Sequence, residues 1–339
     1  MRWRPWPANG AWANSSSMKP EQLPEEFLAR LQQIVPAAHW PRVRASFATP
    51  RRLAFRLNPL RGEPQQVLEE LAELGLQPEP VNGLPLAYTL PATARPRLTH
   101  APAHEEGRLY VQGIASMLAG LLLAPRPGER ILDLAAAPGG KTLHLAAMMH
   151  NQGWISAVEQ VKPRYYRLKA NVLRHGAHCV HTYLMDGARV WRKCPEQFDR
   201  VLLDAPCSSE ARFQLQQADS FAFWSRRKIR EMSRKQGRLL FSAVQSLKPG
   251  GCLLYATCSF APEENEAPVS KILRTFGDAL SIEALQPPLA DAHWQPGLTH
   301  WQGKAFAPAM AHSLRLLPDE RVGGFYLCKL RKHRSTLRD

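Results

Sequence analysis

The sequence predicts an α/β protein in which a Rossmann-like domain with a mostly parallel sheet follows a small α+β unit. From residue 128 onward, short apolar segments alternate with longer segments that carry apolar residues at helical spacing. The apolar segments have the length and aliphatic composition of buried strands. A strand–helix–strand alternation of this kind builds a doubly wound sheet. The 339 residues leave room for a second, smaller unit before this domain.

The order of the elements in the larger domain follows from this alternation. Strands are expected at 130–136, 154–159, 179–186, 199–205 and 251–259, with helices at 141–149, 163–176 and 225–247. Pro163 and Gly176 mark the start and the end of the second helix. Two more strand-like segments, 313–318 and 323–330, are joined by a turn, which predicts an antiparallel hairpin at the end of the sheet.

The residues before the larger domain have mixed helical and extended patterns. We expect a helix at 19–34, a strand at 53–60, a helix at 64–75, an extended segment at 81–90, a surface connection at 100–107 and a helix at 110–123. The resulting division is a disordered leader at 1–17, a small N-terminal domain at 18–105, the larger domain at 106–332 and a basic tail at 333–339. The leader lacks the apolar core of a secretory signal, and Met18 is a candidate start codon.

The net charge of +15 favours a polyanionic partner, most simply a nucleic acid, although a merely basic soluble protein would also fit. No apolar run reaches the ~18 residues of a transmembrane helix, so no membrane partner is expected. The six cysteines form no CxxC pair and no disulfide-scaffold spacing. This predicts a reducing, cytoplasmic setting and argues against a zinc site. We expect a monomer.

The segment DLAAAPGGKT (133–142) follows an expected strand and opens an expected helix, where small residues let the backbone approach a ligand. A dinucleotide fingerprint would require GxGxxG, which is absent. A P-loop requires a glycine five residues before the GKT at 140–142, and Ala135 occupies that position. A P-loop-like nucleotide hydrolase, with VLLDAP (201–206) as its acidic strand, is therefore kept as an alternative.

Acidic residues at three expected strand ends favour a third ligand, the nucleoside sulfonium S-adenosylmethionine. Glu159 closes the second strand and suits a ribose diol, and Asp186 closes the third and can flank an adenine edge. Asp204 closes the fourth strand. Three carboxylates would repel a triphosphate but not a sulfonium cation. The structural alternative is that each acid only caps a helix or a loop.

Three motifs in this order, DLAAAPGGKT, DAPCSSE and YATCSFAPEENE, resemble the Nop/Sun family of RNA cytosine-5 methyltransferases, which includes the bacterial Sun/Fmu-type enzymes. The resemblance covers roughly residues 105–332, including the closing RLLPDERVGGFYLCKLRK. It implies a Rossmann-like, S-adenosylmethionine-dependent methyltransferase domain that acts on RNA, with ribosomal RNA favoured and transfer RNA as the other candidate. The unit at 18–105 looks like the small RNA-binding domain of that family.

The resemblance also implies roles for individual residues. Cofactor contacts are implied at Ala135, Ala136, Ala137, Pro138, Gly139, Gly140, Lys141, Glu159, Asp186 and Asp204. Cys258 is implied as the nucleophile, and Cys207 as the residue that assists release of the methylated base. Lys141 and Asp204 are implied to face the target cytosine.

Cysteine suits this reaction because carbon-5 of cytosine needs activation before it accepts a methyl group. A thiolate that adds to carbon-6 makes carbon-5 nucleophilic, and the same thiolate leaves once the carbon-5 proton is lost. A free thiol has a pKa of about 8.5, so the site must favour the thiolate, with Lys141 or the sulfonium as the expected cation. Cys207 and Cys258 each follow an apolar strand and precede a serine. The remaining cysteines are interpreted as small core residues: Cys179, Cys194, Cys252 and Cys328.

Several other assignments stay open. The Pro206–Cys207 dipeptide resembles locally the nucleophile motif of DNA cytosine-5 methyltransferases, whereas the TCS context with PEENE (262–266) favours Cys258. The acids of PEENE suit the start of the next helix. The family glycine after the Pro-Cys motif is missing from CSSEARF (207–213), so a different loop path is expected. A non-catalytic RNA-binding ribosome-assembly factor is the third function class, and no C-terminal RNA-targeting module is expected.

Overall fold

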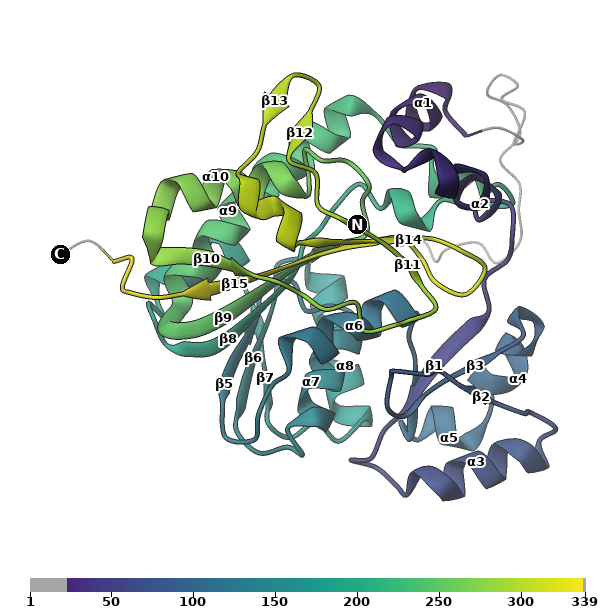
Figure 1. Cartoon of the computed structure of the whole chain (residues 1–339). Helices are drawn as coiled ribbons and strands as arrows, with labels where there is room; N and C mark the ends of the chain where they lie inside the picture. Colours follow the sequence, from purple (N-terminus) through teal and green to yellow (C-terminus); the bar gives the residue numbers. More distant parts are fainter. Residues whose placement is uncertain (1–22, 338–339) are drawn as a thin grey trace, which may run out of the picture.

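The computed structural model describes residues 23–337, and its larger part is a nine-stranded sheet with helices on both faces (Figure 1). The strand order is β11-β14-β15-β9-β8-β5-β6-β7, and β10 pairs with the far half of β15. The strands are β5 (Arg130–Asp133), β6 (Trp154–Glu159), β7 (Val180–Leu184), β8 (Phe198–Asp204), β9 (Leu247–Thr257), β10 (Leu280–Glu283), β11 (His293–Pro296), β14 (Leu314–Leu317) and β15 (Phe325–Lys332). Strands β5 to β9 are parallel, and β15 is antiparallel to both β9 and β14. The predicted parallel sheet with a C-terminal antiparallel hairpin is confirmed.

Alternating side chains of the parallel strands enter two apolar layers, one on each face of the sheet. Leu202 and Leu254 pack in the layer that includes α6, α7 and α8. Leu203 and Tyr255 pack in the opposite layer, which includes α9 and α10. These helices are α6 (Ile114–Leu123), α7 (Gly140–Met148), α8 (Lys162–Arg174), α9 (Arg226–Ser246) and α10 (Glu266–Phe276). Burial on both faces explains why the strands have continuous apolar sequences.

A separate antiparallel sheet, in the order β2-β3-β1-β4, lies at the lower right of Figure 1. Its elements are β1 (Leu53–Leu57), α3 (Pro64–Glu73), β2 (Glu79–Pro80), β3 (Ala87–Leu90), α4 (Arg95–Thr99), α5 (Pro102–Glu105) and β4 (Leu109–Val111). Phe55 and Leu57 of the central strand and Leu71 of α3 belong to its core. The expected surface connection at 100–107 contains α5. Pairing of β4 with β1 carries this unit past residue 105 and delays the start of α6 to Ile114.

The helices α1 (Glu25–Ile34) and α2 (Trp40–Ala45) lie apart from the antiparallel sheet and pack on the larger domain instead, mainly on the loops after β8 and β9. The Phe27 ring centroid lies 5.0 Å from that of Phe213 and 5.8 Å from that of Trp224. Arg30 Nη2 donates to both carboxylate oxygens of Glu263, at 2.9 and 2.8 Å. Residues 23–111 therefore form two structural parts, because the apolar face of α1 meets an aromatic surface of the larger domain. The expected leader at 1–17, Met18 and the last two residues lie outside the described residues.

Short elements complete the chain. They are η1 (Ala37–His39), η2 (Ala92–Ala94), η3 (Gly187–Arg192), η4 (Glu210–Arg212), η5 (Ala218–Ser220), η6 (Gly277–Ala279), η7 (Pro308–His312) and the hairpin of β12 (His300–Trp301) and β13 (Lys304–Ala305). Between residues 23 and 337, no helix combines the length and the apolar character needed to cross a membrane.

Candidate active site

A cleft of about 1030 Å³ opens where the parallel strands β5, β6, β8 and β9 end. The loops after these strands line it, together with Arg51 and Gln112 from the N-terminal part of the chain. In an open α/β sheet this carboxyl edge is where ligands bind. Of the residues assigned to the site from the sequence, all except Gly139 and Asp186 line this cleft.

The glycine-rich turn joins β5 to α7 along one wall of the cleft. Gly139 has a φ of +113°, a conformation that side chains rarely adopt. Two side chains of α8 hold the turn: Arg164 Nη2 donates to the Ala137 carbonyl at 2.7 Å, and Asn171 Nδ2 donates to the Pro138 carbonyl at 2.8 Å. The turn thus brings the amino end of α7 to the cleft, where the helix dipole suits an anionic ligand group.

Glu159 ends β6, and its carboxylate has one free acceptor position. Its Oε1 accepts a hydrogen bond from the Val161 N–H at 2.8 Å. Its Oε2 is buried and has no hydrogen-bond donor within residues 23–337, although Arg164 Nη2 lies 3.6 Å away. A buried oxygen without a donor is costly, so a ligand hydroxyl would relieve it. The vicinal hydroxyls of a ribose fit this position, and S-adenosylmethionine carries such a ribose.

Asp186 lies one strand farther out, beyond β7. It is the N-cap of η3, and its Oδ1 accepts a hydrogen bond from the Ala188 N–H at 3.0 Å. Its side chain lines a second groove on the far side of η3, outside the cleft. Capping, the structural alternative for this acid, is therefore the role that the structure shows, and its contact with an adenine edge stays a prediction.

Lys141 and Asp204 form an ion pair on the wall of the cleft. Lys141 Nζ donates to Asp204 Oδ2 at 2.6 Å and to Ser116 Oγ at 2.6 Å. The ammonium lies 5.6 Å from the centroid of the Phe325 ring. The pair presents a cationic donor and a carboxylate acceptor side by side, which can bind the polar edge of a planar base.

Cys207 and Cys258 meet in the same cleft. Cys207 follows β8 and Cys258 follows β9, and these strands are neighbours in the sheet. Their Sγ atoms lie 3.1 Å apart, and both residues are partly exposed. Ser209 Oγ lies 3.7 Å from the Cys258 sulfur and 4.0 Å from the Cys207 sulfur. The structure thus brings together the two cysteines that the sequence singled out.

The two thiols have opposite pKa shifts. A hydrogen bond from Cys207 is the main cause that lowers the pKa of Cys258 to about 6, and the Arg212 charge and the Ser209 hydroxyl act in the same direction against burial. The same hydrogen bond and burial raise the pKa of Cys207. Cys258 is therefore the thiolate of the pair at neutral pH, and Cys207 is its thiol donor.

Arg212 is the cation of this chain that acts on Cys258, a part for which the sequence predicted Lys141 or the sulfonium. The Arg212 guanidinium is the cation that lowers the pKa of the Cys258 thiol, and both side chains line the cleft. Lys141 is held by Asp204 instead. No motif marks Arg212 in the sequence, because its effect depends on how the loop after Cys207 folds back over Cys258.

Two buried carboxylates join the cysteine loops. Glu264 accepts hydrogen bonds from the Ser208 N–H at 2.9 Å, from the Ser208 hydroxyl and from Gln236 Nε2 at 2.9 Å. Ser259 Oγ lies 2.9 Å from Glu264 Oε1 and 3.0 Å from Glu210 Oε2. Burial, with the nearby Glu210 charge, raises the pKa of Glu264 to about 7. Glu264 thus connects the serine after Cys207 to the serine after Cys258.

The acids of PEENE have more than the expected role at a helix start. Helix α10 begins at Glu266, whose buried carboxylate pairs with Arg315 from β14. Glu264 instead lies beneath the cysteine loops. Glu264 lies five residues after Ser259, and this closeness to the second Cys-Ser pair was the signal in the sequence that could have identified it.

The loop after Cys207 turns without the family glycine. Ser209 adopts the left-handed conformation, with φ 61° and ψ 26°, which glycine would adopt with less strain. Arg51 Nη2 donates to the Ala211 carbonyl at 2.8 Å and ties the loop to the segment before β1. The departure in the sequence therefore coincides with an unusual backbone conformation.

Comparisons with known proteins agree with this geometry. A family model described as 16S rRNA methyltransferase RsmB/F matches residues 120–331. The chain belongs to this family. A second model, the N-terminal domain of 16S rRNA methyltransferase RsmF, matches residues 23–113. The N-terminal match spans the antiparallel sheet together with α1 and α2.

Members of the RsmB/F family are similar to this chain over most of its length. Ribosomal RNA small subunit methyltransferase F from Vibrio vulnificus is 36% identical over 267 residues, which cover 78% of this chain and 56% of that protein. The protein of the same name from Serratia proteamaculans is 34% identical over 318 residues, covering 93% and 64%. The chain thus spans less than two thirds of the length of these relatives.

Solved structures show the same fold. PH0851 superimposes with a TM-score of 0.78 at 31% identity, covering 91% of this chain and 66% of that chain. A methyltransferase homologue from Pyrococcus horikoshii gives 0.74 at 29% identity, covering 91% and 100%. The predicted Rossmann-like methyltransferase fold and the predicted family are confirmed.

Proposed function

We propose that this chain is an S-adenosylmethionine-dependent methyltransferase that forms 5-methylcytosine in RNA, with ribosomal RNA as the substrate. The observation that carries the proposal is the pair of cysteine sulfur atoms 3.1 Å apart, in the same cleft as the Lys141–Asp204 pair. Cytosine-5 chemistry needs a nucleophile that can add and then leave, and a second group that assists its departure.

S-adenosylmethionine, when bound, supplies an electrophilic methyl group. Glu159 would hold its ribose, and the turn at 135–140 would hold its amino-acid end, with Lys141 and Asp204 at the border with the base. The adenine contact predicted for Asp186 would lie past the edge of the cleft, where Asp186 caps η3. Support for this placement comes from the free acceptor on Glu159 and from the amino end of α7 at the cleft.

The residues of the chain then act on the cytosine. The Cys258 thiolate adds to carbon-6, and the electron pair moves onto the ring and makes carbon-5 nucleophilic. Asp204 accepts a hydrogen bond from the amidine edge of the base and stabilises its protonated form, and Lys141 holds Asp204 in place. Carbon-5 then bonds the methyl group as the methyl–sulfonium bond breaks. Solvent water takes the carbon-5 proton, and the electron pair of that C–H bond restores the ring double bond and expels Cys258 from carbon-6 as a thiolate. Cys207 donates its S–H to the departing sulfur, the same hydrogen bond that lowers the pKa of Cys258.

This chemistry requires Cys258 to stay reduced although another thiol lies in contact with it. All six cysteines are free in the structure. A reducing compartment such as the cytoplasm meets this requirement. The target base must also leave its stack to reach the sulfur, so an unpaired cytosine is the expected substrate.

The test is methyl transfer from tritium-labelled S-adenosylmethionine to transcripts of small-subunit ribosomal RNA and of transfer RNA, followed by nucleoside analysis. We expect label in 5-methylcytidine of the ribosomal transcript with the wild type, none with Cys258→Ala, and full transfer with Cys194→Ala, a partly exposed cysteine outside the cleft. ATP hydrolysis measured in parallel would be at background. Label in another nucleoside, or transfer that survives Cys258→Ala, would contradict the proposal. RNA binding without any transfer would favour an assembly factor.

A further inference from the structure

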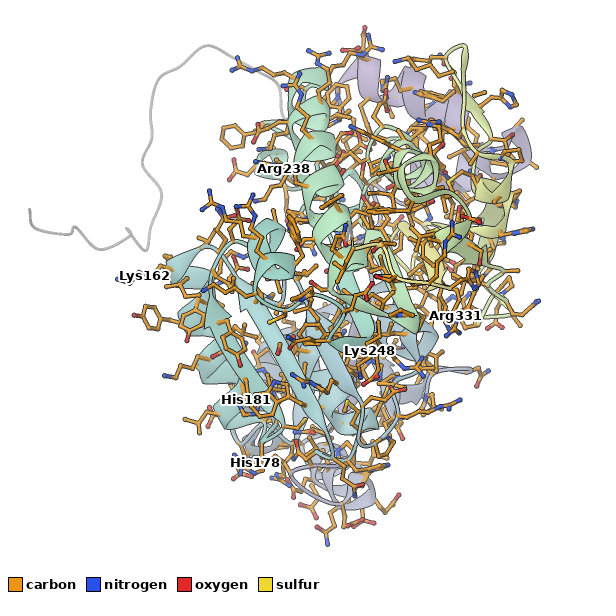
Figure 2. All side chains as sticks on the ribbon, turned by 90° about the vertical axis from the view of Figure 1, so that its left-hand side faces the viewer. Lys162, His178, His181, Arg238, Lys248 and Arg331 are labelled. Atoms are coloured by element: carbon orange, nitrogen blue, oxygen red, sulfur yellow. The ribbon has the colours of Figure 1, made fainter. Side chains whose placement is uncertain are left out.

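Helix α9 carries a row of four arginines on its solvent side. Arg227, Arg230, Arg234 and Arg238 are spaced by three, four and four residues, so they lie on one face of the helix. All four are exposed. Figure 2 shows this side of the molecule, with Arg238 labelled on α9. We name these four residues the arginine row.

The arginine row has no ion-pair partner between residues 23 and 337. Other cations on the same helix do have one: Arg226 pairs with Glu26, and Lys228 pairs with Glu231. The charge of the row is therefore left uncompensated by the described part of the chain. Such a row of fixed positive charge is the electrostatic pattern of a polyanion-binding surface.

A groove of about 480 Å³ lies at the end of the arginine row, between η3, α9 and α10. Trp191 and Phe241 form its aromatic floor, with ring centroids 5.6 Å apart in an edge-to-face arrangement. Its rim carries four cations, Arg189, Arg192, Arg238 and Lys271, and one acid, Asp186. The Arg192 guanidinium lies 5.6 Å from the centroid of the Trp191 ring. The groove thus combines a π surface with a strongly positive rim.

The groove and the catalytic cleft lie on either side of the same turn of α9. Lys235 and Leu239 line the cleft, whereas Gly237, Arg238 and Phe241 line the groove. A chain that leaves the cleft past Lys235 has to cross only this turn to reach the groove. The arginine row extends from there along about 11 residues of helix, roughly 16 Å, which matches about five phosphates of a stacked strand.

We propose that the arginine row and the groove form a track for the single-stranded RNA that flanks the target nucleotide, a proposal that rests on the function proposed above. The row binds successive phosphates, because guanidinium forks bind phosphate oxygens in a bidentate manner. The groove takes one base, stacked on Trp191 or Phe241 under the Arg192 guanidinium. The aromatic floor favours RNA over an acidic peptide, because every nucleotide carries a base that can stack, whereas an acidic side chain has no aromatic ring.

The test is equilibrium binding of a fluorescein-labelled 20-nucleotide single-stranded RNA by the full chain, from 0.05 to 1 M salt. The variant Arg234→Gln/Arg238→Gln removes two charges of the row. The matched control, Arg126→Gln/Arg130→Gln, removes two exposed arginines at the opposite, amino-terminal edge of the sheet. Neither control arginine has an ion pair in the described region, so both variants change the net charge equally.

The row variant is expected to reduce the slope of log K against log salt by about 1.4, which is two phosphate contacts at ~0.7 each. If the binding constants of the row variant and the wild type are equal at 1 M salt, they then differ about 25-fold at 0.1 M salt. The control is expected to follow the wild type. Equal losses of RNA affinity in the row variant and the control, or no loss in the row variant, would overturn the proposal of an RNA track.

A second variant, Arg192→Gln, tests which ligand occupies the groove. We expect it to weaken the binding of single-stranded RNA more than the binding of a duplex of the same sequence, and to leave the KM for S-adenosylmethionine unchanged. A raised KM for S-adenosylmethionine would assign the groove to the cofactor. Equal losses of affinity for the single strand and the duplex would contradict the stacking of a base in the groove. Binding does not depend on methyl transfer. If RNA binding depends on the arginine row but the chain transfers no methyl group, only the proposed function is disproved. If the row variant binds RNA as tightly as the wild type, only the track is disproved, whether or not that variant is active.

Discussion

The sulfur atoms of Cys207 and Cys258 lie 3.1 Å apart, although 51 positions separate the residues in the chain. The contact arises because β8 and β9 are parallel neighbours and each cysteine lies just beyond the end of its strand. It divides one proton unequally between two thiols: the pKa of Cys258 is lowered and that of Cys207 is raised. The asymmetry predicts different roles for the two cysteines.

The first prediction concerns the reactivity of Cys258. The thiolate is the reactive form, so alkylation of Cys258 by iodoacetamide should rise with pH and reach half its maximum near the pKa of about 6. In Cys207→Ala the main stabilising hydrogen bond is absent, and the midpoint should move up toward the ordinary value of about 8.5. Mass spectrometry of the peptide that contains Cys258 gives both midpoints. An unchanged midpoint in Cys207→Ala would show that Arg212 and Ser209 lower the pKa without Cys207.

The second prediction concerns the covalent step. Cys207→Ala should still form the bond between Cys258 and carbon-6 but release the product slowly, because no thiol donates to the departing sulfur. A denaturing gel should then show an enzyme–RNA adduct that the wild type does not accumulate. Cys258→Ala should form none. The reverse pattern, with an adduct only in Cys258→Ala, would exchange the two roles.

The third prediction concerns Ser209. Ser209→Gly should raise the free energy of unfolding by about 0.5–1 kcal/mol, because the relief of a left-handed backbone conformation outweighs the chain entropy that glycine adds to the unfolded state. It should also raise the pKa of Cys258, whose thiolate loses the Ser209 hydroxyl. Ser209→Ala is the matched control, since it removes the hydroxyl but keeps the strain. Urea unfolding and the alkylation midpoint measure the two effects separately.

The fourth prediction concerns Glu264, whose pKa is raised from 4.5 to about 7. The folded chain therefore binds a proton more tightly than the unfolded chain, and stability should fall as the pH rises from about 4.5 through 7. Glu264→Gln cannot ionise, and its amide can satisfy the same serine and backbone partners, so this part of the pH dependence should disappear. Urea unfolding at pH 5.5, 7 and 8.5 measures it. The control Glu231→Gln, at an exposed position, should keep the pH dependence of stability seen in the wild type. A Glu264→Gln variant with the same pH dependence as the wild type would contradict the prediction.

The fifth prediction concerns the buried pair of Arg315 and Glu266, whose side chains are only 4% and 0% exposed. Arg315→Met should cost about 3–5 kcal/mol of unfolding free energy, because it leaves a carboxylate unpaired in the core. Arg315→Met/Glu266→Leu should recover most of this loss. Arg315 also donates to the Phe260 carbonyl, two residues after Cys258, so the single variant should slow methyl transfer as well. A double variant as unstable as the single one would show that other contacts of Arg315 dominate.

Local patterns in the sequence were sufficient for the order of strands and helices, the hairpin at the end of the sheet and the turn at 135–140. Each depends on residues near one another in the chain: apolar runs, a helix start at Pro163, and small residues after a strand. The same patterns located Cys207, Cys258, Glu159 and Asp204, because a parallel sheet collects the residues at its strand ends along one edge.

The tertiary structure decided which groups act on one another across the chain. Arg212, and not Lys141, lies where its charge lowers the pKa of Cys258, because the loop after Cys207 folds back over the cleft. Glu264 joins the two cysteine loops, α1 packs on the larger domain, and Asp186 caps η3 outside the cleft. Such outcomes depend on distances between segments far apart in sequence, and no local pattern encodes those distances.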